Sequence, residues 1–233
     1  HIQSTDIRFK RIWELLPGQS LVFGLPLTYP VWDTDGILVS GIPAPTHSEA
    51  THALVTPKEL ESTVYSGGFT GYYVDENSPV YDSTVSEQIY TEAHLRKTEQ
   101  IIETYVDLYN NKMKGEPRFG FLMLRSIDDL LHATATDEHI ETVYEQIDSL
   151  TAKVVDEVDP EHVLILSDHG MRPTSRLRID ADLRMDHDTS EGIWGSTADL
   201  DLHRQMGVSQ AILRLFEQEQ SLPVEKRGYD VET

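Results

Sequence analysis

The sequence contains no cysteine and little positive charge. Its 233 residues include 19 Lys and Arg against 40 Asp and Glu, a net charge of −21. Without cysteine there is no disulfide framework, no Cys-ligated zinc or iron–sulfur site and no thiol nucleophile. Duplex nucleic acid and anionic membrane surfaces are poor partners, because contacts to phosphate groups need clustered Lys and Arg. The composition therefore argues against a binder of nucleic acid or of anionic membranes.

Long hydrophobic runs are absent as well. The most apolar stretches, Phe119–Leu124 and Val163–Leu166, fall far below the roughly 20 residues that span a bilayer. We therefore expect no membrane segment. Hydrophobic residues still make up 39% of the chain, enough to form a core. The chain begins with His1 rather than Met, so we expect a processed or truncated polypeptide.

The composition also indicates an environment. Only 7 Lys stand against 12 Arg, and acidic residues are spread along the whole chain. Acid-rich, lysine-poor, cysteine-free sequences resemble proteins of salt-loving archaea, where molar salt screens the repulsion among surface carboxylates; the Debye length is about 3 Å at 1 M. The alternative is an ordinary acidic protein of the cytoplasm. We expect a cytoplasmic protein from a high-salt cell.

Hydrophobic periodicity predicts alternating helices and strands in one α/β domain over residues 1–233. Fully apolar strands are typical of a parallel sheet whose two faces are both covered by helices. Residues 46–81, rich in Gly, Pro, Ser and Thr, are expected to form an irregular insertion. The predicted helices are Ile7–Leu16, Ser83–Lys114, Asp137–Val158 and Val208–Glu219, and the predicted strands are Ser20–Leu25, Gly36–Ile42, Arg118–Leu124 and His162–Ser167.

Two Asp–His pairs follow the last two predicted strands. Asp128 and His132 are four residues apart, and Asp168 and His169 are adjacent. A helical turn would place Asp128 and His132 on one face, where carboxylate and imidazole can bind one Zn²⁺ or Mn²⁺ ion. Each pair alone could instead be a helix cap or a turn. Two pairs at the carboxyl ends of neighbouring buried strands favour a metal site.

These segments also resemble a known family. Ile165–Met171 (ILSDHGM) is similar to the strand-plus-DHGM motif of the type I phosphodiesterase/nucleotide pyrophosphatase branch of the alkaline phosphatase superfamily. The Asp128-x-x-x-His132 motif resembles a second motif of that branch. Phe23–Pro30 and Gly36–Gly41 are similar to a segment of its archaeal members, and Asp186–Trp194 resembles the family's late His-plus-Gly segment that provides another ligand.

The resemblance implies an alkaline-phosphatase-like fold and a hydrolase of phosphate esters with two divalent ions, Zn²⁺ or alternatively Mn²⁺. One ion would be held by Asp128, His132 and His187, with His203 as the rival to His187. The other would be held by Asp168 and His169, together with an earlier Asp and a Thr or Ser nucleophile. The implied substrates are small phosphate esters or nucleotides.

In one respect the sequence departs from the family. The first strand, which carries that Asp and the nucleophile, has no counterpart, so we expect it upstream of His1. Without it the chain could be a catalytically silent metal-binding module, and a phosphomutase or sulfatase-like enzyme is a further alternative. Arg125 and Arg172 adjoin the two motifs and could bind a phosphate oxygen, or they could simply pair with a carboxylate.

Overall fold

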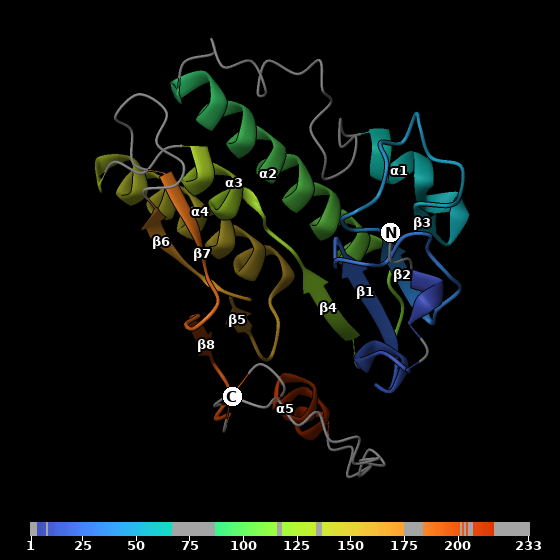
Figure 1. Cartoon of the computed structure of the whole chain (residues 1–233). Coiled ribbons are helices and arrows are strands. Elements are labelled where there is room, and N and C mark those ends of the chain that lie inside the picture. Colours follow the sequence, from blue (N-terminus) through green and yellow to red (C-terminus); the bar gives the residue numbers. More distant parts are fainter. Residues whose placement is uncertain are drawn as a thin grey trace.

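A computed structural model gives the fold (Figure 1). It describes residues 4–7, 9–66, 87–115, 118–133, 137–174, 184–200, 202, 204 and 207–216. No helix within this part of the chain is long and apolar enough to cross a membrane.

The main sheet has four strands in the order β3-β2-β1-β4. The three longer strands, β1 (Gln19–Phe23), β2 (Gly36–Val39) and β4 (Arg118–Leu122), run parallel to one another. The short β3 (Val55–Thr56) pairs antiparallel with β2. The sheet is therefore mixed, and the prediction of an α/β fold with a mostly parallel sheet is confirmed for these strands.

Two faces of this sheet are covered differently. Leu21 and Phe23 of β1 point to one face, where they pack with Ile102 and Tyr105 of α2 (Glu87–Asn111). The alternating residue Val22 lies on the other face with Trp13 and Leu38. Side chains alternate between faces because successive residues of a strand point to opposite sides. The longest helix thus covers one face of the sheet and the N-terminal segment covers the other.

Gly36 shows why glycine stands at the start of β2. Its φ is +131°, a conformation that other residues rarely adopt. A Cβ there would lie 2.1 Å from the carbonyl oxygen of Ser20, its register partner in β1. Only glycine lets the two parallel strands begin this close together.

Most of the predicted helices are present. α4 (Asp137–Val158) has its predicted bounds. α2 is present but ends at Asn111, three residues before the predicted end at Lys114, and residues 83–86 lie outside the described residues. α5 (Val208–Leu215) ends earlier than predicted, and residues 217–219 are outside the described part. The short α3 (Ser126–Ala133) follows β4 and supplies the helical turn expected around Asp128.

The predicted helix over Ile7–Leu16 is wrong. The described residues there form a single 3-10 turn, Ile12–Glu14. The Glu14 carboxylate accepts hydrogen bonds from the backbone N–H of Arg11 and from the indole N–H of Trp32, both at 2.9 Å. Such a short helix is marginal in water by itself, so these tertiary bonds determine the local structure.

The segment predicted to be irregular is partly regular. Between Thr46 and Ser66 it contains β3, a 3-10 turn at Lys58–Leu60 and α1 (Glu61–Ser66). Val64 of α1 is fully buried in the main core, which explains why a short helix forms here despite a weak periodic signal. The rest of the predicted insertion, residues 67–81, lies outside the described residues.

The last predicted strand does not join the main sheet. β5 (Leu164–Leu166) pairs antiparallel with β8 (Trp194–Ser196) in a separate two-stranded sheet. Full burial of this strand is also wrong, because Ile165 and Leu166 are 50% and 40% exposed. β4 is only partly buried as well. Among the described strands, β4 and β5 each have a partner along one edge only.

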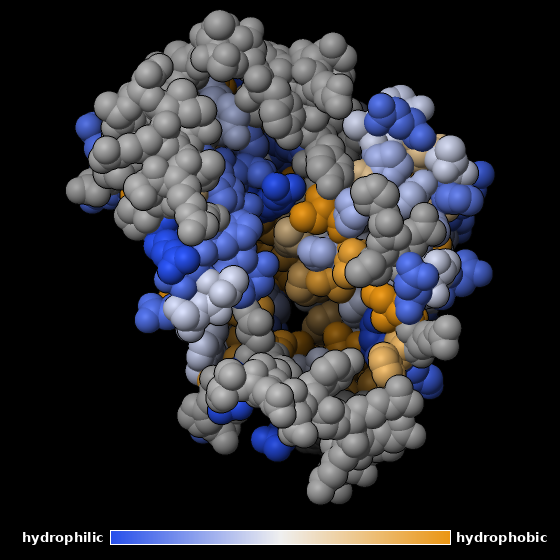
Figure 2. All heavy atoms as spheres, viewed as in Figure 1, coloured by the Kyte–Doolittle hydropathy of each residue, from blue (hydrophilic) through white to orange (hydrophobic). Residues whose placement is uncertain are grey.

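A hydrophobic hollow lies in the same region. Figure 2 shows hydrophobic residues, in orange, around a depression near the middle of the molecular surface in view. Figure 1, seen from the same side, draws β4 and β5 there. Both strands lead into segments that meet at one cluster, since Asp128 follows β4 and His169 follows β5. They therefore run in the same general direction toward that cluster.

Candidate metal centre

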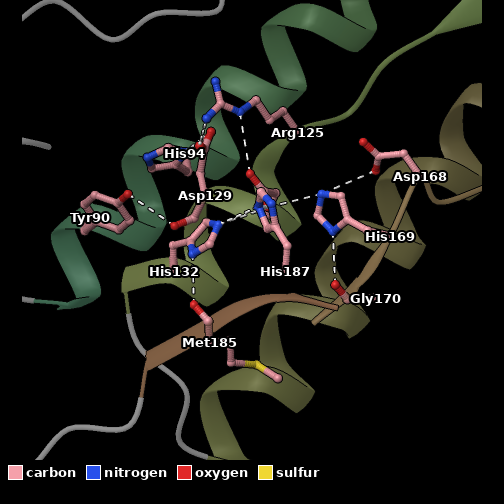
Figure 3. A network of polar contacts seen from close by, with 11 residues as sticks. Tyr90, His94, Arg125, Asp129, His132, Asp168, His169, Gly170, Met185 and His187 are labelled. Atoms are coloured by element: carbon pink, nitrogen blue, oxygen red, sulfur yellow. Dashed lines mark hydrogen bonds and ion pairs between the residues drawn. The ribbon is translucent and has the colours of Figure 1, made fainter. Parts of the chain in front are cut away.

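Three side chains bring ligand atoms together beyond the end of β4 (Figure 3). Asp128 and His132 come from α3, and His187 comes from β7 (Arg184–Asp188). His187 Nε2 lies 3.0 Å from Asp128 Oδ1 and 2.9 Å from His132 Nε2. His132 Nε2 lies 3.3 Å from the same Asp128 oxygen. The three residues that the sequence predicted as ligands of the first ion therefore lie together.

Local structure explains this convergence. Asp128 and His132 are one turn apart on α3, so they lie on the same side of the helix. β7 pairs antiparallel with β6 (Gly170–Thr174) and puts His187 opposite Met171. Neither β6 nor β7 was predicted, because the first contains a proline and neither contains a run of apolar residues.

The His132 ring is fixed by a backbone contact. Its Nδ1 lies 2.9 Å from the carbonyl oxygen of Met185, to which Nδ1–H donates. The neutral ring then keeps a lone pair on Nε2, the atom that faces Asp128 and His187. A hydrogen bond of this kind to the second ring nitrogen is typical of metal-binding histidines.

The second predicted pair lies beside the first three residues. The His169 ring stacks on His187 with 3.9 Å between ring centroids, and His169 Nε2 lies 3.9 Å from Asp128 Oδ1. His169 Nδ1–H donates to the Gly170 carbonyl oxygen at 3.0 Å. Asp168 places Oδ1 3.6 Å from His169 Nε2 while its side chain is 85% exposed. The structure thus brings all five predicted ligands to one cluster.

The donor set fits a divalent ion. In a tetrahedral site, ligands about 2.0–2.2 Å from the ion lie roughly 3.3–3.6 Å from one another. The three distances among Asp128 Oδ1, His132 Nε2 and His187 Nε2, from 2.9 to 3.3 Å, lie at or just below this range. One carboxylate and neutral imidazoles suit Zn²⁺ and Mn²⁺ alike.

Other predicted residues are placed differently. Arg125 contacts two carboxylates, with Nη2 2.9 Å from Asp129 Oδ1 and Nε 3.8 Å from Asp128 Oδ2. Arg172 lies exposed on β6, where its charge helps to lower the pKa of Asp188, after the larger effect of hydrogen bonds from Ser190. His203, the rival to His187, is outside the described residues.

Sequence reasoning missed the charged groups behind the ligands. Asp129 lies among Arg125 and two α2 residues, His94 and Lys97. Burial raises the pKa of Asp129, although Arg125 opposes this shift. Burial also lowers the pKa of Lys97 to about 8. The only signal in the sequence was a second Asp beside Asp128, which by itself indicates nothing more than a cap.

Acidification should destabilise the fold through His94. Burial, followed by the charges of Lys97 and Arg125, lowers the His94 pKa from 6.5 to about 4, although the Asp129 carboxylate lies 3.8 Å from Nδ1. As the pH falls below about 6.5 the unfolded chain gains a proton that the folded chain takes up only near pH 4. The free energy of unfolding should therefore decrease across this window, by at most about 1.4 kcal/mol per pH unit.

Urea denaturation between pH 7 and pH 4 measures this effect. His94→Gln should show a shallower dependence of unfolding free energy on pH than the unmodified protein. His162→Gln, which changes an exposed histidine, is the matched control and should keep the original slope. An unchanged slope in His94→Gln would show that other groups cause the acid sensitivity.

Comparison with known proteins assigns the chain to a family. Comparison with curated proteins and with solved structures gave no match. The family model described as type I phosphodiesterase/nucleotide pyrophosphatase matches residues 16–229, nearly the whole chain and all five clustered residues. The chain belongs to the type I phosphodiesterase/nucleotide pyrophosphatase family, whose members are hydrolases of phosphate esters.

Proposed function

We propose that this chain hydrolyses small phosphate esters or nucleotides with two divalent ions. Asp128, His132 and His187 hold the first ion, and Asp168 and His169 contribute to the second. The observation that carries the proposal is the convergence of segments distant in sequence, with ligand-atom separations of 2.9 to 3.3 Å. Zn²⁺ is the favoured metal and Mn²⁺ the alternative.

Each residue has a definite part in this mechanism. The two fixed imidazoles, His132 and His169, direct Nε2 lone pairs toward the Asp128 carboxylate and need no reorganisation before a cation binds. Asp168 is exposed, so it can contact a second ion or a substrate from the solvent side. Bound divalent ions supply Lewis-acid stabilisation of the charge that develops on the phosphoryl oxygens.

A further strand completes the sheet in this proposal. It precedes residue 1, lies between β4 and β5, and brings the metal-binding Asp and the Thr or Ser nucleophile to the cluster. Two observations support it: each of the two strands has a partner along only one edge among the described residues, and Ile165 and Leu166 are exposed although apolar. An apolar strand inserted there would pair both edges and cover these side chains.

The substrate is expected to be small. The acidic surface offers few Lys and Arg side chains to neutralise a polyanion, whereas a single phosphate group can be neutralised by the ions at the cluster. This restriction separates nucleotides and simple diesters from duplex nucleic acid, which would bring many phosphates near the acidic surface.

Hydrolysis of bis(4-nitrophenyl) phosphate tests the proposed function. The protein should be expressed from its complete gene, loaded with Zn²⁺ or Mn²⁺ and assayed in about 1 M KCl, which screens the repulsion among carboxylates. We expect turnover, and a loss of about 100-fold or more in Asp168→Ala. His162→Ala removes an exposed histidine that precedes β5 and pairs with Glu161 rather than with the cluster, and it should retain turnover.

Three outcomes would contradict the proposal. Turnover that survives both Asp168→Ala and His132→Ala would exclude these residues from catalysis. Metal binding without turnover would indicate a silent module. Transfer of phosphate to a substrate hydroxyl rather than to water would indicate a mutase.

A further inference from the structure

A charged layer behind the ligands connects α3 to α2. Figure 3 shows Arg125 and Asp129 between the ligand cluster and the α2 residues His94 and Tyr90. Tyr90 donates its hydroxyl to the backbone carbonyl of Asp129 at 3.4 Å. Because His94 is only 5% exposed and Asp129 is about one-fifth exposed, this layer is largely shielded from water. Charges placed there interact more strongly than they would at the surface.

The two oxygens of Asp128 face different partners. Oδ1 faces His187 Nε2 and His132 Nε2, at 3.0 and 3.3 Å. Oδ2 faces Arg125 Nε at 3.8 Å. A metal at the cluster would take Oδ1, so the orientation of the carboxylate depends on what holds Oδ2.

Arg125 is itself held by Asp129. Nη2 of the guanidinium lies 2.9 Å from Asp129 Oδ1, a charge-assisted contact. It is much closer than the 3.8 Å between Nε and Asp128 Oδ2. The other Asp129 oxygen, Oδ2, lies 3.8 Å from His94 Nδ1, and the charge of Lys97 acts on the same carboxyl. Asp129 therefore contacts His94 of α2 through Oδ2 and Arg125, the residue before α3, through Oδ1.

We propose that Asp129 is a positioning residue of the proposed metal centre. Asp129 binds Nη2 of Arg125. The Nε atom is then the part of the guanidinium that reaches Oδ2 of Asp128. Oδ1 then stays directed at the imidazoles. The proposal rests on the proposed function, because it concerns the ligand geometry of the same centre.

Removal of Asp129 would free Arg125 to act against the metal. A guanidinium without a second carboxylate forms a two-point contact with the one that remains, and this contact would occupy both oxygens of Asp128. Arg125 would then compete with the cation for Oδ1. The competition disappears if Arg125 is removed too, which a purely structural role of Asp129 does not predict.

A double-mutant cycle tests this inference by calorimetric titration with Zn²⁺. Asp129→Asn should weaken binding about 10- to 100-fold, the usual effect of outer-shell changes. Asp129→Asn with Arg125→Gln should bind more tightly than Asp129→Asn alone. Asp148→Asn, at an exposed position of α4, removes the same charge and should bind like the unmodified protein.

The possible results are distinct. Unchanged affinity in Asp129→Asn, or equal losses in the single and double variants, would overturn the positioning role. If Asp128→Ala and His132→Ala keep full affinity, the proposed centre itself is wrong. Should Asp129→Asn not fold without metal, Arg125→Lys gives an independent test. An ammonium lacks the rigid fork that presents one nitrogen to Asp129 and another to Asp128, so we expect about a 10-fold loss, and unchanged affinity overturns the inference.

Discussion

Asp128→Ala should reduce the affinity for Zn²⁺ or Mn²⁺ by more than about 100-fold. Outer-shell changes at metal sites already cost about 10- to 100-fold, and Asp128 supplies the ligand oxygen itself. Its Oδ1 lies within 3.0 to 3.9 Å of the Nε2 atoms of His187, His132 and His169. Loss of this carboxylate also removes the negative charge nearest to His132 and His187, which would offset part of the charge of a dication.

Calorimetric titration and thermal unfolding with and without metal provide the measurement. A ligand present at 100 times its dissociation constant stabilises the folded state by about 2.7 kcal/mol, and Asp128→Ala should lose this gain. Asp156→Ala, on the exposed side of α4, is the charge-matched control.

Substitution of His187 extends the same test to the third predicted ligand of the first ion. His187→Ala should weaken binding as strongly as His132→Ala, because the two Nε2 atoms lie together. If His203→Ala abolishes binding while His187→Ala does not, the rival assignment of the third ligand is correct. Retention of full affinity in all of these variants would exclude the cluster as a metal site.

The sequence predicted the elements that carry regular periodicity. α4 has its predicted bounds, and Asp128 and His132 lie one turn apart on α3 as their spacing required. These predictions succeed because the helix period and the i, i+4 relation are local properties of the chain. The strands β1, β2 and β4 were recognised for a similar reason, since continuous apolar runs bounded by Pro and Gly are read within a short window.

Reasoning from local sequence patterns could not predict contacts between segments that are distant in the chain. β7 carries His187 but has only one apolar residue, Met185, and it pairs with β6 along five register positions. Only resemblance to a family indicated His187. The burial of β5 was overestimated because apolar composition indicates that a strand should be covered, not which segment covers it. Asp129 was missed because its importance depends on the distant α2 residue His94.

Phe23→Ala should destabilise the protein by about 3–5 kcal/mol, the usual cost of truncating a buried phenylalanine. Phe23 is the last residue of β1, is fully buried, and meets Tyr105 of α2 edge-on at 6.4 Å between ring centroids. β1 lies between β2 and β4, so the side chain has few directions in which the core can collapse. Phe9→Ala is the matched control, since Phe9 is 74% exposed, and its effect should stay within about 0.5 kcal/mol.

Urea denaturation of both variants checks this difference, and equal stabilities would show that the α2 face of the sheet is not the main core. The same variant also tests how the core relates to the metal cluster. One helix, α2, packs on Phe23 through Tyr105 and lies beside Asp129 through His94. The backbone N–H of Met123 also donates to the Phe23 carbonyl oxygen, just before the chain enters α3. This backbone hydrogen bond does not depend on the Phe23 ring, so folded Phe23→Ala should bind metal like the unmodified protein. Weaker binding in the folded variant would instead mean that packing against α2 holds the ligands in place.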